Sequence, residues 1–278
     1  MTARPRRPRD RALAMLCWAL AAAGGIAMII PVATMLSASL KDASAIYDPA
    51  FLPRAPTLAN YRELLSNGQF LTWLANSFGL ATFATTSNLF FDSLVGYTLA
   101  RLRFRGRDLV FVTILSTVMV PTEMLVIPWY SLARSLGWLD SYWGIVFPGM
   151  MTAFGTFLMR QFFLTVPEDF LEAARIDGLG EFHIWWEVAL PMVTPALSAV
   201  AIFTFLGNWT AFLWPLIVTT SQRLYTLPVG LASFAAEQET HWELVMTGAS
   251  IATLPALAIF LLFRRYIVRG VLLTGLKG

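Results

Sequence analysis

The chain has 278 residues, a net charge of +3, 57% hydrophobic residues and only 13% charged residues. Soluble proteins usually carry about 25% charged residues, so this composition argues against a soluble protein, and the charge distribution does not indicate nucleic-acid binding. The single cysteine, Cys17, lies in an apolar run, which excludes a disulfide framework and a cysteine metal site.

The first predicted element is a membrane helix behind a basic arm. Residues 1–11 carry five arginines, and residues 12–40 carry no charge. Since about 20 apolar residues cross a membrane, the uncharged run predicts a first span. A basic start followed by an apolar run is also typical of a secretory signal peptide. The run is longer than the about 7–15 residues of a signal core, and the rest of the chain would still be a membrane protein.

Five further apolar segments follow in chain order. They predict helices at residues 66–100, 109–130, 142–163, 188–222 and 244–263. The polar segments 41–70 and 221–242 are predicted to be external loops. The sequence therefore predicts an all-α integral membrane protein with six transmembrane helices, in which residues 12–278 form a single transmembrane domain after the arm at residues 1–11.

The distribution of basic residues predicts the orientation. With the N-terminus inside, cytoplasmic segments hold 15 of the 20 lysines and arginines. Such a bias is what the positive-inside rule describes, and six spans then return the C-terminus to the cytoplasm. The loop between the fourth and fifth helices also becomes cytoplasmic. The basic residues left outside are Lys41, Arg54, Arg62, Arg134 and Arg223.

That loop is unusually polar for this chain. Between Arg160 and Glu187 lie six acidic residues, two arginines and a histidine. Pro167 suits the first position of a helix, and Gly178 suits the positive-φ position that closes one. A second short helix would begin after Gly180. The pattern predicts a short amphipathic docking helix, with an ordinary interfacial helix on the lipid surface as the alternative.

Within this loop, Glu172-Ala173-Ala174, three residues, Gly178, nine residues, Val188, one residue and Leu190-Pro191 form a spaced motif. The motif resembles the cytoplasmic loop of the membrane subunits of bacterial ABC importers, in which isoleucine is more common at the position of Val188. The resemblance implies the type I ABC importer permease fold, with an ATPase-docking loop at residues 166–191. The implied coupling residues are Glu172, Ala173, Ala174, Asp177, Gly178, Leu190 and Pro191.

The rest of the chain resembles the carbohydrate branch of these permeases, the relatives of the maltose and glycerol-3-phosphate systems. This resemblance implies import of a sugar or sugar-like solute. A disaccharide or oligosaccharide, an amino sugar and a glycerol phosphate ester all remain open. The segments that carry the resemblance are residues 101–107, 120–121, 137–144, 207–216, 224–231 and 275–278.

Polar and aromatic residues inside the spans are the candidates for the substrate path, because polar groups there are costly unless they face a cavity or a partner. Asn208 can donate and accept hydrogen bonds, and Trp209 and Trp214 offer flat faces that suit sugar rings. Thr210 lies directly after Trp209 and is a further candidate. The alternatives are interface anchoring by tryptophan and helix joining by asparagine. Relatives often have Trp-Asn at this place, so the individual contacts stay open.

Two carboxylates lie inside the predicted spans. Glu123 could line the pathway or pair with a neighbouring subunit. For Asp92 we favour snorkelling toward Arg101 or pairing with Arg103. In a different class of protein, a stand-alone proton-coupled carrier or intramembrane enzyme, Asp92 and Glu123 would be the proton-handling pair.

No GxxxxGK[ST] phosphate loop occurs in the sequence, so ATP-Mg is expected on a separate ATPase, and this chain is expected to be non-catalytic and without a cofactor. His183 and Glu187 are one helical turn apart, but without a third ligand nearby no metal site is predicted. The resemblance implies a bacterial inner-membrane protein. Its expected partners are a second, homologous permease subunit, two cytoplasmic ABC ATPase domains, an extracytoplasmic solute-binding protein, membrane lipid and the solute, with no nucleic acid.

Overall fold

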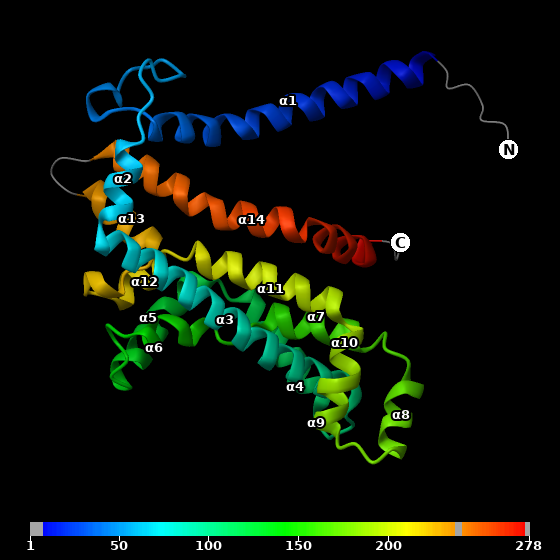
Figure 1. Ribbon diagram of the computed structural model, residues 1–278. Helices are drawn as coiled ribbons and strands as arrows, with labels where there is room; N and C mark the ends of the chain where they lie inside the picture. The colour runs from blue at the N-terminus through cyan, green and yellow to red at the C-terminus, as the bar shows by residue number, and fades with distance from the viewer. Residues whose placement is uncertain (1–7, 237–240, 276–278) are drawn as a thin grey trace. The chain divides into compact units, whose positions relative to one another are not determined.

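The computed structural model describes residues 8–236 and 241–275, and within them every regular element is helical (Figure 1). The α-helices are α1 (Pro8–Ser39), α2 (Ala59–Ser66), α3 (Gly68–Arg101), α4 (Arg107–Ser116), α5 (Thr122–Ser135), α6 (Tyr142–Val146), α7 (Ala153–Phe163), α8 (Glu168–Ile176), α9 (Glu181–His183), α10 (Leu190–Met192), α11 (Thr194–Trp209), α12 (Leu213–Val218), α13 (Leu227–Ala236) and α14 (Trp242–Gly275). Short 3-10 turns lie at η1 (Ala43–Ala45), η2 (Thr117–Met119), η3 (Phe147–Gly149) and η5 (Gln222–Leu224), and a π-helical segment lies at η4 (Ile184–Ala189).

The chain divides into two compact units, Met1–Ser66 with Ser233–Ile251, and Asn67–Ala232 with Ala252–Gly278. In the first unit, Lys41 is buried, and its Nζ donates to the carbonyl oxygens of Asp48 and Ala50 at 2.7 and 2.9 Å. Asn60 of α2 donates to the carbonyl oxygens of Ser39 and Lys41. These bonds satisfy buried backbone acceptors and hold the loop after α1 in place.

The second unit is built around α3, which packs along α7 and α11. Gly96 permits the close approach of α7, because a Cβ at this position would lie 2.7 Å from the Cβ of Met159. Tyr97, Phe163 and Trp185 are fully buried at the centre of this packing. Within this unit, α8 to α10 lie at one end of α3, and α5, α6 and α12 lie at the other (Figure 1).

In the part of the chain that it describes, the structure supports fewer membrane spans than the six that the sequence predicts. Two helical stretches of the described residues, Ala14–Ser39 and Trp242–Ile259, are long and apolar enough to cross a membrane, and the number rises to at most five when each bent pair counts as one span. The first and last predicted helices therefore correspond to continuous helices, and α3 matches the helix predicted at residues 66–100. The count of six spans is not confirmed.

The helices predicted at residues 109–130, 142–163 and 188–222 are each interrupted in the structure. The axis bends by 105° between Arg107–Met119 and Thr122–Ser135, by 43° between Tyr142–Gly149 and Ala153–Phe163, and by 86° between Glu181–Met192 and Thr194–Trp209. The first break has a clear local cause. Pro121 lacks an amide donor and forces the preceding residue, Val120, into an extended conformation.

The polar loop predicted at residues 221–242 is also corrected, because α13 lies inside it. Its start is fixed by α3. Asn76 Nδ2 donates to the carbonyl oxygens of Arg223 and Tyr225 at 2.8 and 2.9 Å, and the amide of Leu227 donates to Ser77 Oγ at 2.7 Å. These tertiary hydrogen bonds have no signature in the local sequence.

Candidate functional site

The predicted docking loop contains two short helical segments joined by a glycine turn. Pro167 is the N-cap of α8, one residue before the position predicted for it, and two acidic residues follow in the first turn. Gly178 has a φ of +87°, which confirms the predicted positive-φ turn. The turn is closed by the amide of Gly178, which donates to Arg175 O, and the amide of Leu179, which donates to Ala174 O. Gly180 is the N-cap of α9, as predicted.

The two faces of α8 differ sharply. Leu171 and Ala174 are buried in the core of this chain, so the small side chain of Ala174 lies against the protein's own core and not on the outer face of α8. Glu172, Ala173 and Asp177 are exposed. Leu190 packs against the core cluster from α10, and Pro191 beside it is exposed.

Two large apolar side chains share the exposed face of α8 with these carboxylates. Phe170 is 54% exposed and Ile176 is 86% exposed. Apolar groups that gather with a polar rim on the surface of a protein commonly mark a contact surface. The outer face of α8 therefore combines negative charge with apolar anchors.

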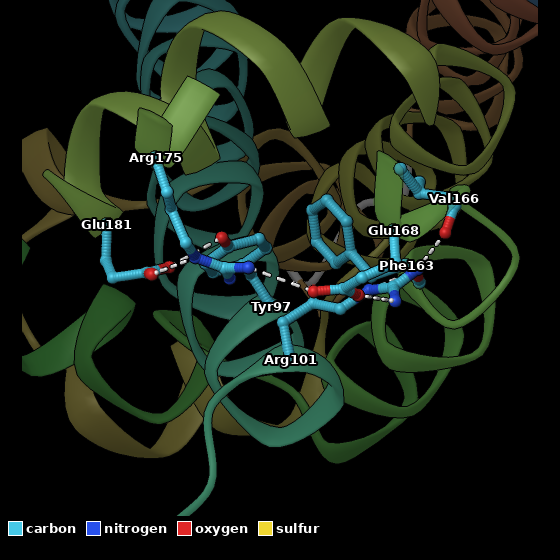
Figure 2. Close-up of polar contacts among 7 residues, drawn as sticks. All are labelled: Tyr97, Arg101, Phe163, Val166, Glu168, Arg175 and Glu181. Carbon is cyan, nitrogen blue, oxygen red and sulfur yellow. Dashed lines mark hydrogen bonds and ion pairs between the residues drawn. The ribbon is translucent and has the colours of Figure 1, made fainter. Parts of the chain in front are cut away.

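The inner side of α8 is held by a cluster of charges (Figure 2). Arg175 donates to Glu168 at 2.9 Å and to Glu181 at 2.7 Å. The second oxygen of Glu168 accepts from Arg101 at 2.8 Å, and the second oxygen of Glu181 accepts from the Tyr97 hydroxyl at 2.9 Å. Tyr97 and Arg101 belong to α3, so the cluster ties the docking loop to the end of the central helix.

Arg101 extends this tie to the end of α7. Its guanidinium also donates to the carbonyl oxygens of Phe163 and Val166, which lie at and just after the last turn of α7. A planar guanidinium with five donors can bind several acceptors at fixed angles, as it does here. We refer to Tyr97, Arg101, Glu168, Arg175 and Glu181 as the end cluster.

The charges of the end cluster support one another. The hydrogen bond from Arg175 lowers the pKa of Glu181, and the hydrogen bonds to Glu181 and Glu168 raise the pKa of the Arg175 guanidinium. Two arginines and two glutamates balance within the cluster. The negative charge that remains on α8 belongs to Asp169 and Glu172, with Asp177 directly after the helix, and all three are exposed.

Asp92 makes a different contact from the one predicted. Its side chain is 0% exposed and accepts from the amide of Thr152 at 2.9 Å and from Thr152 Oγ1 at 2.7 Å. Thr156 Oγ1 lies 3.4 Å from the same carboxylate. Snorkelling toward Arg101 or pairing with Arg103 is therefore wrong, because the start of α7 supplies donors that are closer than any arginine.

Neighbouring residues of α3 bind the backbone carbonyl groups in the break between η3 and α7. Ser87 Oγ donates to Met150 O at 2.7 Å, and Asn88 Nδ2 donates to Gly149 O at 2.5 Å. Backbone groups outside a helix cannot be left unpaired in the hydrocarbon region of a membrane. We refer to Ser87, Asn88 and Asp92, with the segment 149–152 that they bind, as the middle seam.

Of the five predicted substrate-path residues, two line a common cavity and three do not. Asn208 and Trp214 line a cavity of about 300 Å³, which we refer to as the span cavity. Trp209 is 3% exposed and donates from Nε1 to Ala252 O at 2.9 Å, so it is part of the packing. Thr210 and Glu123 are exposed and do not line the cavity, whereas Thr122, next to Glu123, does.

Among the lining residues that sequence reasoning did not single out, two have side chains suited to a solute site. They are Trp129 of α5 and Thr226, directly before α13. Trp129 lies near the end of the span predicted at residues 109–130, and Thr226 lies in the segment predicted as an external loop. Thr226 does belong to the segment 224–231, which carries part of the family resemblance, but the resemblance implied no function for that segment.

Comparison with known proteins identifies the family. Residues 92–273 match the family described as "Binding-protein-dependent transport system inner membrane component". The chain belongs to that family. It is a membrane permease subunit of an ABC importer, and this membership supports the importer over the stand-alone carrier or intramembrane enzyme.

Two curated relatives of the permease match over most of its length. The arabinooligosaccharides transport system permease protein AraQ of Bacillus subtilis is 36% identical, with 90% of this chain and 91% of AraQ covered. The sn-glycerol-3-phosphate transport system permease protein UgpE of Yersinia enterocolitica is 33% identical, with 94% and 96% covered.

A solved structure shows that the fold of the permease is that of an ABC importer subunit. One chain of a bacterial ABC transporter involved in the import of the acidic polysaccharide alginate superimposes with a TM-score of 0.87 at 23% identity, over 95% of this chain and 99% of that one. A chain of an alginate transporter in complex with its pentasaccharide-bound periplasmic protein gives a TM-score of 0.66 at 12% identity.

Proposed function

We propose that this permease forms half of the pathway by which an ATP-driven importer carries a sugar or sugar-like solute across the bacterial inner membrane. The names of its relatives support this solute class, since AraQ is named for arabinooligosaccharides and UgpE for sn-glycerol 3-phosphate. In the proposed assembly, residues 12–278 act as one transmembrane domain with both termini in the cytoplasm. Residues 1–7 and 276–278 lie outside the described residues.

The proposed partners follow from the family. A second, homologous permease subunit completes the pathway, two cytoplasmic ATPase domains bind ATP-Mg, and an extracytoplasmic binding protein delivers the solute. The permease itself is non-catalytic and holds no cofactor. A periplasmic binding protein is named in the complex of one structural neighbour, which supports the last of these partners.

The observation that carries the proposal is the outer face of α8. Glu172 and Asp177 offer carboxylates there, and Ala173 leaves room for a partner backbone. The end cluster holds the inner side of the same helix against α3 and α7. A push from closing ATPase domains would therefore pass from α8 through Arg175 and Glu168 to Arg101, while Gly178 keeps the turn and Leu190 and Pro191 anchor its far side.

Two substitutions test the docking role in the assembled importer. Ala173→Glu adds bulk and charge at the proposed contact, and Gly178→Asp adds a side chain and a second carboxylate beside Asp177, at a φ of +87° where glycine is preferred. Both are expected to abolish copurification of the ATPase and uptake while the protein still inserts. The matched control, Ala173→Ser, keeps the side chain small and should retain both. Normal uptake by Ala173→Glu would contradict the docking role.

A further inference from the structure

The span cavity lies where interrupted helices meet. Gly149 ends η3 before the break that precedes α7, Thr122 is the first residue of α5 after the bend at Pro121, and Ala211 lies between α11 and α12. Non-helical backbone at membrane depth is tolerated where it is buried in protein or lines a cavity, and discontinuous helices form the solute sites of many transporters. The position of this cavity is that of a solute site.

One buried hydroxyl at the span cavity has no partner. Thr226 lines the cavity and is 3% exposed, and its Oγ1 forms no hydrogen bond within the described residues. Buried polar side-chain atoms almost always have a partner, so an unpaired one needs an explanation. Asn208 lines the same cavity, and because its Nδ2 donates to Thr204 O at 2.9 Å, its Oδ1 is the atom available to accept. Thr226 and Asn208 together offer a donor and an acceptor to a hydroxylated ligand.

The aromatic part of the cavity wall is fixed in position. Trp214 Nε1 donates to Gly144 O and Ile145 O at 3.0 and 3.2 Å, and the Trp129 ring packs edge-to-face on Trp214 with 5.7 Å between the ring centroids. Pre-formed aromatic walls with a few placed polar groups are the usual construction of a small-molecule site. Such walls suit the apolar face of a sugar ring.

The absence of charged side chains from the described lining of the span cavity indicates which class of solute it can bind. Among the described residues that line the span cavity, none is charged. Burying a phosphate or carboxylate without a paired cation is very costly, whereas a neutral hydroxylated ring needs only hydrogen bonds. We infer that the span cavity takes a neutral sugar unit, without phosphate or carboxylate, and that Thr226 is a specificity-determining residue of this site. This inference rests on the proposed function and sharpens it.

Cysteine protection in the full importer in proteoliposomes tests the site. Cys17 is the only cysteine, so Cys17→Ser provides a background in which Ala211→Cys places one thiol at the cavity. The rate of its modification by a methanethiosulfonate reagent is measured with arabinotriose, sn-glycerol 3-phosphate or an alginate trisaccharide. Arabinotriose is expected to slow the reaction, and the two anionic solutes are not. Ala75, which lines a neighbouring groove beside Tyr142 and not the span cavity, provides the matched control Ala75→Cys, which should not be protected.

The role of Thr226 is tested in the same assay. Thr226→Val keeps the shape and removes the hydroxyl, so it should raise the arabinotriose concentration needed for protection about fivefold, the usual effect of one hydrogen bond, while Thr226→Ser should not. Unchanged protection in Thr226→Val, protection by the anionic solutes, equal protection of Ala75→Cys or no protection of Ala211→Cys would each overturn the inference. Uptake is measured separately in the Cys17→Ser parent and in Ala173→Glu. Uptake by the parent and its loss in Ala173→Glu test the proposed function independently of the cavity.

Discussion

The central helix α3 is fixed at two places by opposite means. At the end cluster, charges pair with charges, and the side chains of Glu168, Arg175 and Glu181 are 46%, 33% and 41% exposed. At the middle seam, Asp92 is fully buried and binds an amide and hydroxyls of the start of α7, and it forms no ion pair with any residue that the structure describes. The chain thus uses ion pairs where water is available and helix capping where it is not.

The difference predicts how each place responds to substitution. An exposed ion pair contributes about 0–1 kcal/mol, because water competes for both partners. Removing one partner of a buried hydrogen bond leaves the other unsatisfied, which costs about 1–3 kcal/mol. The middle seam should therefore determine the stability of the fold, and the end cluster should determine how motion of α8 reaches α3.

The largest effect on stability is expected for Asp92→Ala. It removes the acceptor of the Thr152 amide and hydroxyl, and should lower the free energy of unfolding by about 2 kcal/mol. Thermal unfolding of the purified permease measures this. Asp92→Asn is the matched control, because it retains one oxygen acceptor and nearly the same volume, and it should lose about half as much. Equal losses in the two variants would mean that charge, and not capping, holds the seam.

Gly155 gives an independent check of the same contact. A Cβ at this position would lie 1.9 Å from Asp92 Oδ2, so Gly155→Ala should displace the carboxylate and destabilise the fold by about 1–3 kcal/mol. In the double variant with Asp92→Ala, the clash with the carboxylate is gone and only the contact with Thr152 Oγ1, at 2.8 Å, remains, so the loss should be smaller than the sum of the two single losses. Additive losses would show that Gly155 and Asp92 act separately.

A smaller effect on stability, but a larger one on coupling, is expected for Arg175→Gln. The variant breaks both ion pairs of Arg175 and should change the free energy of unfolding by no more than about 1 kcal/mol. The stimulation of ATP hydrolysis by the loaded binding protein should fall, because only the contact of Glu168 with Arg101 then ties α8 to α3. Arg107→Gln is the control, since it makes the same exchange and breaks an ion pair, with Asp108, that lies outside the end cluster. Undiminished stimulation in Arg175→Gln would contradict the coupling role of the end cluster.

The contrast also explains what the sequence could reveal. The turn at Gly178 and the exposed face of α8 depend on neighbours within a few residues, and both were predicted. The partner of Asp92 is Thr152, 60 residues away, and depends on how α3 and α7 pack. The nearest cations in the sequence, Arg101 and Arg103, were therefore a misleading guide.

The breaks in the predicted spans also depend partly on local sequence and partly on tertiary packing. Pro121 signals its bend locally, through its missing amide and its effect on Val120. The break at residues 149–152 begins at Pro148-Gly149, a dipeptide typical of turns, but the side chains of Ser87, Asn88 and Asp92 that stabilise it come from α3 and have no local signature. The span cavity depends on both breaks, so its lining could be only partly predicted, with Asn208 and Trp214 found and Trp129 and Thr226 missed.

The smallest effect is expected at Asp140, which repeats the capping chemistry of Asp92 in an exposed loop. Asp140 accepts from Ser221 Oγ and from the amides of Ser221 and Thr220 at 2.8 and 2.9 Å. These hydrogen bonds, chiefly that from the Ser221 side chain, lower the pKa of Asp140 from 3.8 to about 2. Because the folded-state pKa is depressed, the carboxylate stabilises the fold above pH 4, and this contribution is lost as the pH falls from about 4 to 2.

Asp140→Asn isolates this contribution. Asp140 has a φ of +53°, and asparagine tolerates positive φ as well as aspartate does, so the backbone is matched. The melting temperature of the unsubstituted permease should fall between pH 4 and 2 by more than that of Asp140→Asn. At neutral pH the variant should lose about 1 kcal/mol or less, because water screens the loop. A loss at pH 7 as large as that of Asp92→Ala would show that burial is not what separates the middle seam from exposed capping sites.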